Sequence, residues 1–196
     1  MNKLAFFDVD GTLYKGNSTF DFIEYVNRSN KEYSVFRDKY RYLRIYNKVL
    51  NTFFHYDWYK LKSAEFLAGY SNEKLELLAH SFYQDVLLKN EIQPVLDLLS
   101  FYKANNYQVV LVTATFDPIV KIIAQYLGVN DYFCTRLVYK NGICTGKYEK
   151  DILNDKLSIV SEKYNLSNCI SVFYSDNHQD IPLLKKTTLG AYIVKK

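Results

Sequence analysis

Two patterns of hydrophobic positions alternate along this chain. Short, continuous apolar runs occur at 4–9, 108–115, 169–176 and 190–194, and the first three end at polar or turn-forming residues. Runs of this length predict strands that are buried on both faces of a parallel sheet. Between the runs that follow Pro94, helical periodicity predicts helices up to about residue 105, over 154–165 and over 180–186.

Local signals at turns support this alternation of strands and helices. In "FDPIVKIIAQYLG", Asp117 is the expected N-cap, Pro118 occupies the first helical position and Gly128 ends the helix. Asn141-Gly142, between two short β-type runs, predicts a hairpin with a type I′ turn. We therefore predict an α/β fold with a three-layer, mostly parallel, Rossmann-like sheet.

A different pattern covers residues 18–88. This stretch contains no proline and a single glycine, and Ser71 with Glu73 begins a helical segment that continues to Leu88. Earlier in the stretch, apolar positions recur at spacings of three and four, with one polar exception, at Tyr33, Phe36, Tyr40, Leu43, Asn47 and Leu50. We expect an all-helical cap over 17–90, inserted into an α/β catalytic core formed by 1–16 and 91–196.

Composition narrows the classes of partner. The net charge is +4 and no run of five Lys or Arg residues occurs, which argues against nucleic acid and equally suits a small anionic substrate. Cys134, Cys144 and Cys169 lack paired metal-type spacing and fit unpaired thiols in a reducing compartment. No leader-like segment and no apolar stretch of about 20 residues is present, so we expect a soluble, cytoplasmic protein with no membrane contact. No obligate protein partner is evident.

Acids and hydroxyls follow three of the predicted strands. Asp8 and Asp10 follow the first, Thr113 and Thr115 end the second, and Asp176 follows the third. The carboxyl ends of parallel strands meet at one edge, where such carboxylates require a cation. Oxygen ligands alone indicate Mg²⁺. In phosphoryl transfer, one carboxylate attacks phosphorus, a second serves as general acid and base, and Gly11 allows close backbone approach.

Four motifs in order resemble those of the haloacid dehalogenase superfamily. They are "DVDGTL" at 8–13, "VLVTAT" at 110–115, a Lys that begins a helix in "NDKLSIV", and "YSDNHQDIPLL" at 174–184. The insertion directly after the first motif is similar to the cap of the phosphoserine-phosphatase-like branch. The resemblance covers the predicted core and implies an inserted helical cap.

The resemblance assigns roles by position. It implies that Asp8 is the nucleophile and Asp10 the general acid and base. Mg²⁺ would be held by the Asp8 side chain, the Asp10 backbone carbonyl and the Asp176 side chain, with Asp180 behind them. The phosphoryl oxygens would contact Thr113, the Ala114 backbone N–H and Lys156. Lys150 competes with Lys156 for the lysine role, although Lys156 begins the amphipathic run as the third motif does.

Other residues carry weaker signals. His178 lies near Asp176, but an oxygen-ligand site does not need imidazole, which favours loop packing. Asn17 stands where phosphoserine phosphatases carry a Glu that holds the substrate's amino group, which weakens phosphoserine as substrate. A basic stripe at helical spacing more often forms a solvated face than an anion site; it comprises Arg37, Arg41, Arg44 and Lys48.

The leading hypothesis is a Mg²⁺-dependent phosphomonoesterase that acts on a small phosphorylated metabolite, such as an amino-alcohol or polyol phosphate, through an aspartyl-phosphate. The alternatives are a phosphotransferase or phosphomutase that uses the same intermediate, and a catalytically retired phosphate-binding module. Product analysis with an acceptor alcohol separates the two enzymes. The intact set of Asp8, Asp10, Lys156 and Asp176 argues against the retired module, because a retired site has no physical reason to keep uncompensated acids.

Overall fold

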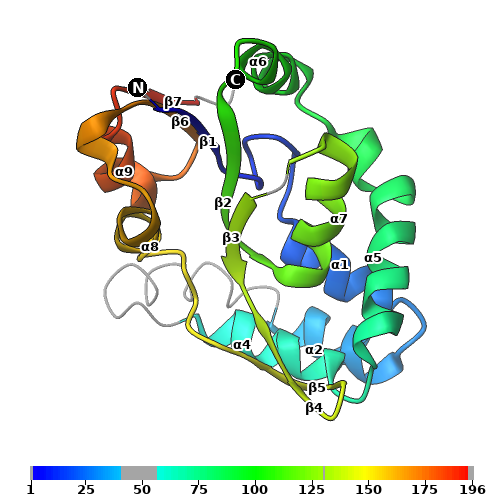
Figure 1. Ribbon diagram of the computed structural model, residues 1–196. Coiled ribbons are helices and arrows are strands. Elements are labelled where there is room, and N and C mark those ends of the chain that lie inside the picture. The colour runs from blue at the N-terminus through cyan, green and yellow to red at the C-terminus, as the bar shows by residue number, and fades with distance from the viewer. Residues whose placement is uncertain (1, 41–56, 130, 194–196) are drawn as a thin grey trace.

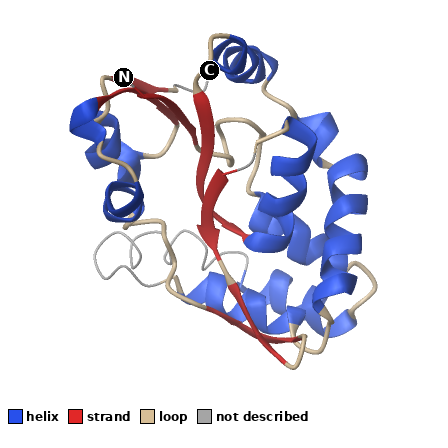
Figure 2. Ribbon diagram, viewed as in Figure 1, coloured by secondary structure: helices blue, strands red, loops and turns tan. Residues whose placement is uncertain are grey.

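A five-stranded parallel sheet forms the centre of the molecule (Figures 1 and 2). The computed structural model describes residues 2–40, 57–129 and 131–193. The strands run in the order β3-β2-β1-β6-β7, and each neighbouring pair is parallel. Their bounds are β1 Asn2–Phe7, β2 Gln108–Phe116, β3 Asp131–Thr135, β6 Cys169–Ser175 and β7 Leu189–Tyr192.

Helices cover both faces of this sheet, which confirms the predicted three-layer architecture. Along β1, Ala5 and Phe7 join one buried cluster with α6 (Gln93–Ala104) and α7 (Asp117–Leu127). Leu4 and Phe6 join a second cluster with α8 (Lys156–Lys163) and α9 (Ile181–Lys186). Successive side chains of a strand point to opposite faces, so a continuous apolar run supplies both clusters.

Every regular element that the structure describes between β1 and α6 is a helix or a 3-10 helix. Ser71 accepts a hydrogen bond from the Lys74 N–H and caps the longest of these helices, as expected. Positions 43, 47 and 50 of the expected helical repeat lie outside the described residues. The division into cap and core stays a prediction. The elements are α1 Ser18–Val26, α2 Lys31–Tyr40, α4 Trp58–Ala64, η1 Glu65–Leu67, α5 Asn72–Asp85 and η2 Leu87–Asn90.

The predicted hairpin consists of β4 (Leu137–Lys140) and β5 (Ile143–Tyr148). Asn141 and Gly142 have φ of 52° and 78°, the positive values that a type I′ turn requires. The Cys144 N–H donates to the Tyr70 carbonyl at 2.8 Å, and the Gly69 N–H donates to the Cys144 carbonyl at 2.9 Å. A segment from the C-terminal half of the chain therefore docks on the helical insertion.

The start of one helix was predicted wrongly, and one strand was missed. The N-cap of α7 is Phe116, because β2 continues directly into the helix. Asp117 is therefore the first helical residue and Pro118 the second, and Asp117 accepts a hydrogen bond from the Leu137 N–H at 2.8 Å. Strand β3 was not predicted, since "DYFCT" is a short edge strand that carries an acid and only half-buried apolar residues. Within the described residues, no helix is both long and apolar enough to cross a bilayer.

Candidate active site

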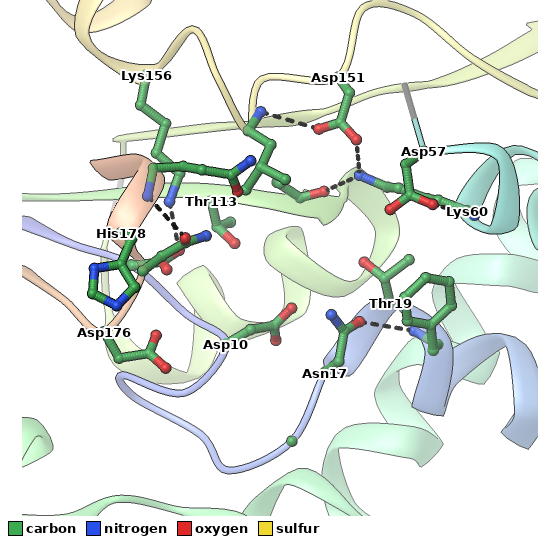
Figure 3. Close-up of a pocket in the computed structure, with 17 residues that line it drawn as sticks. Asp10, Asn17, Thr19, Asp57, Lys60, Thr113, Asp151, Lys156, Asp176 and His178 are labelled. Atoms are coloured by element: carbon green, nitrogen blue, oxygen red, sulfur yellow. Dashed lines mark hydrogen bonds and ion pairs between the residues drawn. The ribbon is translucent and has the colours of Figure 1, made fainter. Parts of the chain in front are cut away.

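A cavity of about 610 Å³ opens at the carboxyl ends of β1, β2 and β6. The sheet supplies Asp8, Thr113 and, in the loop after β6, Asp176. Figure 3 shows Lys156, Thr113 and Asp176 on one side and residues of the helical insertion opposite them. The residues from the insertion are Asn17, Thr19, Phe20, Asp57 and Lys60. The cavity therefore lies between the carboxyl edge of the sheet and the segments that contain α1 and α4.

Asp8, Lys156 and Asp180 form a buried ion triad. Lys156 Nζ lies 2.9 Å from Asp8 Oδ1 and 2.7 Å from Asp180 Oδ2, and all three side chains are at most 6% exposed. Burial raises the pKa of Asp8 to about 7 against the attraction of Lys156. Burial alone would lower the pKa of Lys156, but Asp8 and Asp180 outweigh it and raise that pKa. The lysine therefore stays charged.

Asp10 is held by donors on two elements. The backbone N–H of Ser18 donates to Asp10 Oδ1 at 2.9 Å, and the Ser18 hydroxyl donates to the same oxygen. The Thr115 hydroxyl donates to Oδ2 at 3.1 Å. Burial raises the pKa of Asp10, and these hydrogen bonds oppose the shift because they stabilise the carboxylate. Asp10 is thus a partly buried acid with a defined orientation.

Thr113 and Ala114 line the cavity where the end of β2 meets it. The Thr113 hydroxyl lies 2.9 Å from the Thr115 hydroxyl. The Ala114 carbonyl accepts a hydrogen bond from Lys60 Nζ at 2.8 Å, and the same ammonium pairs with Asp151 at 2.7 Å. The backbone beside the expected phosphate contacts is therefore fixed by a lysine from α4.

The acidic residues fit a hard cation such as Mg²⁺. Asp8 and Asp176 line the cavity with carboxylate oxygens, and Asp180 Oδ1 is buried with no hydrogen-bond partner in the described residues. Across residues 2–40, 57–129 and 131–193, no three His, Cys, Asp or Glu side chains form a ready ligand group. A cation here would therefore need backbone carbonyl or water ligands beside the two carboxylates.

Of the other residues singled out from the sequence, Asn17 and His178 line the cavity and Lys150 does not. Asn17 lines it and caps α1 by accepting the Phe20 N–H. His178 also lines it, with its ring 5.0 Å from that of Tyr192. Lys150 is 76% exposed and pairs with Asp155 outside the cavity.

Only the first residue of the basic stripe can be placed. Arg37 pairs with Glu24 at the surface, 2.6 Å away. Arg41, Arg44 and Lys48 lie outside the described residues.

No role was predicted for four residues around the site, Ser18, Asp57, Lys60 and Asp151, and Thr115 was expected only as a hydroxyl at the end of a strand. Thr115 lies two positions after Thr113, and the period-two repeat of a strand puts both hydroxyls on one face, so this contact could have been found. Lys60 gave no such signal. It is one of several lysines in the insertion, and only its 5% exposure and its pairing with Asp151 single it out.

Comparison with known sequences gives one family. The family model described as haloacid dehalogenase-like hydrolase matches residues 5–185. A putative hydrolase of Mycobacterium leprae is 27% identical over 195 residues, covering 94% of this chain and 64% of its own length. A phosphoserine phosphatase of Mycobacterium tuberculosis is 28% identical, with 94% and 62% covered. The chain thus spans less than two thirds of these relatives' length.

Solved structures share the fold along nearly the whole chain. A Bordetella pertussis protein of unknown function matches with a TM-score of 0.79 and 26% identity, covering 98% of this chain and 90% of its own. A phospho-aspartyl intermediate analogue of phosphoserine phosphatase matches with a TM-score of 0.62 and 24% identity, covering 97% and 86%. These likenesses confirm the predicted fold class.

Proposed function

Because the chain belongs to the haloacid dehalogenase-like hydrolases, we propose that it is a Mg²⁺-dependent phosphomonoesterase. Its substrate would be a small phosphorylated metabolite, such as an amino-alcohol or polyol phosphate. One observation carries the proposal: the buried triad of Asp8, Lys156 and Asp180 adjoins a cavity that also exposes Asp10 and Thr113. The relative named phosphoserine phosphatase supports the same reaction class.

In the first half of the proposed reaction, a carboxylate oxygen of Asp8 attacks phosphorus. The bond between phosphorus and the substrate's alcohol oxygen breaks, and Asp10 gives that oxygen a proton as it leaves. Lys156 and the Thr113 hydroxyl would stabilise charge on the phosphoryl oxygens, together with the Ala114 N–H. The product on the protein is an aspartyl-phosphate at residue 8.

In the second half, Asp10 takes a proton from a water molecule as that water attacks phosphorus. The acyl-phosphate bond breaks, inorganic phosphate leaves and the Asp8 carboxylate is restored. Asp8, Asp176 and the backbone carbonyl of Asp10 would hold Mg²⁺, which would supply positive charge to balance these acids and the phosphate.

Phosphate release from a panel of phosphorylated metabolites, measured with Mg²⁺, tests this function. We expect release from at least one small alcohol phosphate by the wild type and none by Asp8→Asn. Transfer of phosphate to an added alcohol, in place of release to water, would indicate a phosphotransferase. Failure of the whole panel, while phosphate still binds, would favour the retired binding module.

A further inference from the structure

We propose that Ser18 and Thr115 are positioning residues for Asp10, and that they make Oδ2 the oxygen that exchanges a proton with the leaving group. The inference deepens the proposed phosphatase function and rests on it. Both residues are about 1% exposed, and neither lines the cavity. They can act on the reaction only through Asp10, not through contact with a substrate.

The two carboxylate oxygens of Asp10 differ in how many of their lone pairs are already used by hydrogen bonds. Each oxygen can accept about two hydrogen bonds. Asp10 Oδ1 accepts two, from the Ser18 N–H and from the Ser18 hydroxyl, so it has no place left for a proton. Oδ2 accepts one, from Thr115 at 3.1 Å. Among the contacts of the described residues, its second lone pair is the one position where Asp10 can hold a proton without breaking a hydrogen bond.

The hydroxyl protons fix the direction of this network. Each hydroxyl has one proton, and those of Ser18 and Thr115 are donated to Asp10. In the absence of phosphate, the contact of 2.9 Å between the two β2 hydroxyls is therefore a donation from Thr113 to Thr115, and Thr113 would turn its proton to a phosphoryl oxygen once one binds. Thr113 in turn accepts the Thr115 N–H at 3.2 Å. The residue expected to contact phosphate is thereby linked to the acid by a single intervening hydroxyl.

The consequence for the reaction is specific to one step. As the bond between phosphorus and the leaving oxygen breaks, its electrons stay on that oxygen, which takes the proton from Asp10 Oδ2. Without the Thr115 hydroxyl, Oδ2 loses the one donor that the described residues give it, and the carboxyl is free to turn about the Oδ1 contacts. Proton delivery should suffer, whereas attack by Asp8 and substrate binding should not.

The test compares Thr115→Val, which removes the hydroxyl at nearly constant shape, with Thr115→Ser, which keeps it. Rapid quench measures aspartyl-phosphate formation from phenyl phosphate and from p-nitrophenyl phosphate, whose leaving oxygen needs less protonation. We expect Thr115→Val to slow formation from phenyl phosphate about tenfold, below the ~10²–10⁴ of a whole acid, with a much smaller loss for p-nitrophenyl phosphate. KM should stay constant, and Thr115→Ser should restore the wild-type ratio of the two rates.

Thr187→Val is the control for loss of a buried threonine hydroxyl, since that hydroxyl bonds the Leu184 carbonyl away from the cavity. It should leave both rates unchanged.

Ser18→Ala keeps the backbone donor, so we expect it to reproduce the leaving-group effect more weakly. This variant also tests the proposal if Thr115→Val does not fold. Equal slowing of both substrates by Thr115→Val, or an equal loss in Thr115→Ser, would overturn the positioning role alone. A wild type that releases no phosphate from either ester or from any metabolite of the panel would instead overturn the proposed function and this inference with it.

Discussion

Asp8 and Lys156 show how single side chains acquire their chemistry from burial. Two carboxylates share one ammonium in the triad, so the group keeps excess negative charge in a place that water hardly reaches. That excess is reflected in the pKa of Asp8, which burial raises to about 7. Such an arrangement is costly for stability, and an added cation or a reaction at the carboxylate would relieve it.

The first prediction concerns the covalent intermediate. Wild-type protein quenched in acid during turnover should carry phosphate in an acyl linkage that hydroxylamine cleaves, because the attacking group is a carboxylate. Asp8→Asn should carry none and should lose turnover. Mass spectrometry of the quenched protein locates the adduct. An active enzyme that never accumulates phosphate in rapid quench, or a labelled residue other than Asp8, would contradict the nucleophile assignment.

A second prediction separates the two candidate lysines. Lys156→Met should abolish turnover and lower the free energy of unfolding by about 3–5 kcal/mol, since it leaves two buried carboxylates without a counter-charge. Lys150→Met is the matched control. Its side chain is 76% exposed, so stability should change by less than about 0.5 kcal/mol and activity should persist. Urea unfolding and phosphate release check both variants, and the reverse ranking would assign the role to Lys150.

At the residue scale, the sequence predicts acids and hydroxyls more easily than it predicts their partners. Asp8, Asp10, Thr113 and Asp176 could be assigned because each lies at the end of an apolar run, and strand ends converge at one edge of a parallel sheet. Lys60 could not be assigned, since its pairing with Asp151 depends on how α4 packs against residues 91 positions away. No local pattern in the sequence predicts a contact between two residues that lie 91 positions apart.

At the scale of elements, the hairpin β4–β5 is the piece that joins the two halves of the chain. Gly146 allows its close approach to η1. A Cβ at this residue would lie 2.9 Å from the Glu65 Cα, and the φ of +72° is itself unfavourable for other residues. The Asn-Gly turn was predictable from local chemistry, but the surface on which the hairpin docks was not, because it is formed by residues 65–72 of another segment.

A third prediction follows from this contact. Gly146→Ala should lower the free energy of unfolding by roughly 2–5 kcal/mol, the sum of a left-handed backbone penalty and a backbone clash. Gly69→Ala is the control, since its φ is +86° and nothing lies within 4 Å of the added Cβ. It should cost only the backbone penalty, about 1–2 kcal/mol. Equal losses in denaturant unfolding would show that hairpin docking contributes nothing measurable.

At the scale of the whole molecule, the order of strands decides which residues meet. Because β1 lies between β2 and β6, residues from positions 8, 113 and 176 come together at one edge. That topology is predictable, since sheets of alternating strands and helices have few arrangements. On the far wall only Asn17 was expected, from the family resemblance. Thr19 and Lys60 could not be, because they reach this wall only through the packing of the helices between β1 and α6.

The fourth prediction concerns Mg²⁺ and the stability of the folded chain. An ion that binds only the folded state stabilises it by RT ln(1 + [Mg²⁺]/Kd), which is ~1.4 kcal/mol at ten times Kd. We expect Mg²⁺ to raise Tm for the wild type and a chelator to reverse the rise.

Asp176→Asn should lose most of this response, because one of two carboxylate ligands becomes neutral. Asp10→Asn should keep it, since the proposed ligand there is the backbone carbonyl, which the substitution leaves in place. Ca²⁺ should also raise Tm without supporting turnover, because the larger ion accepts more oxygens and can occupy both oxygens of Asp8. Differential scanning calorimetry alongside phosphate release measures both effects. A Tm response to Mg²⁺ that survives in Asp176→Asn but disappears in Asp10→Asn would show that the Asp10 side chain holds the ion, and that the division of roles between Asp8 and Asp10 is different from the one proposed.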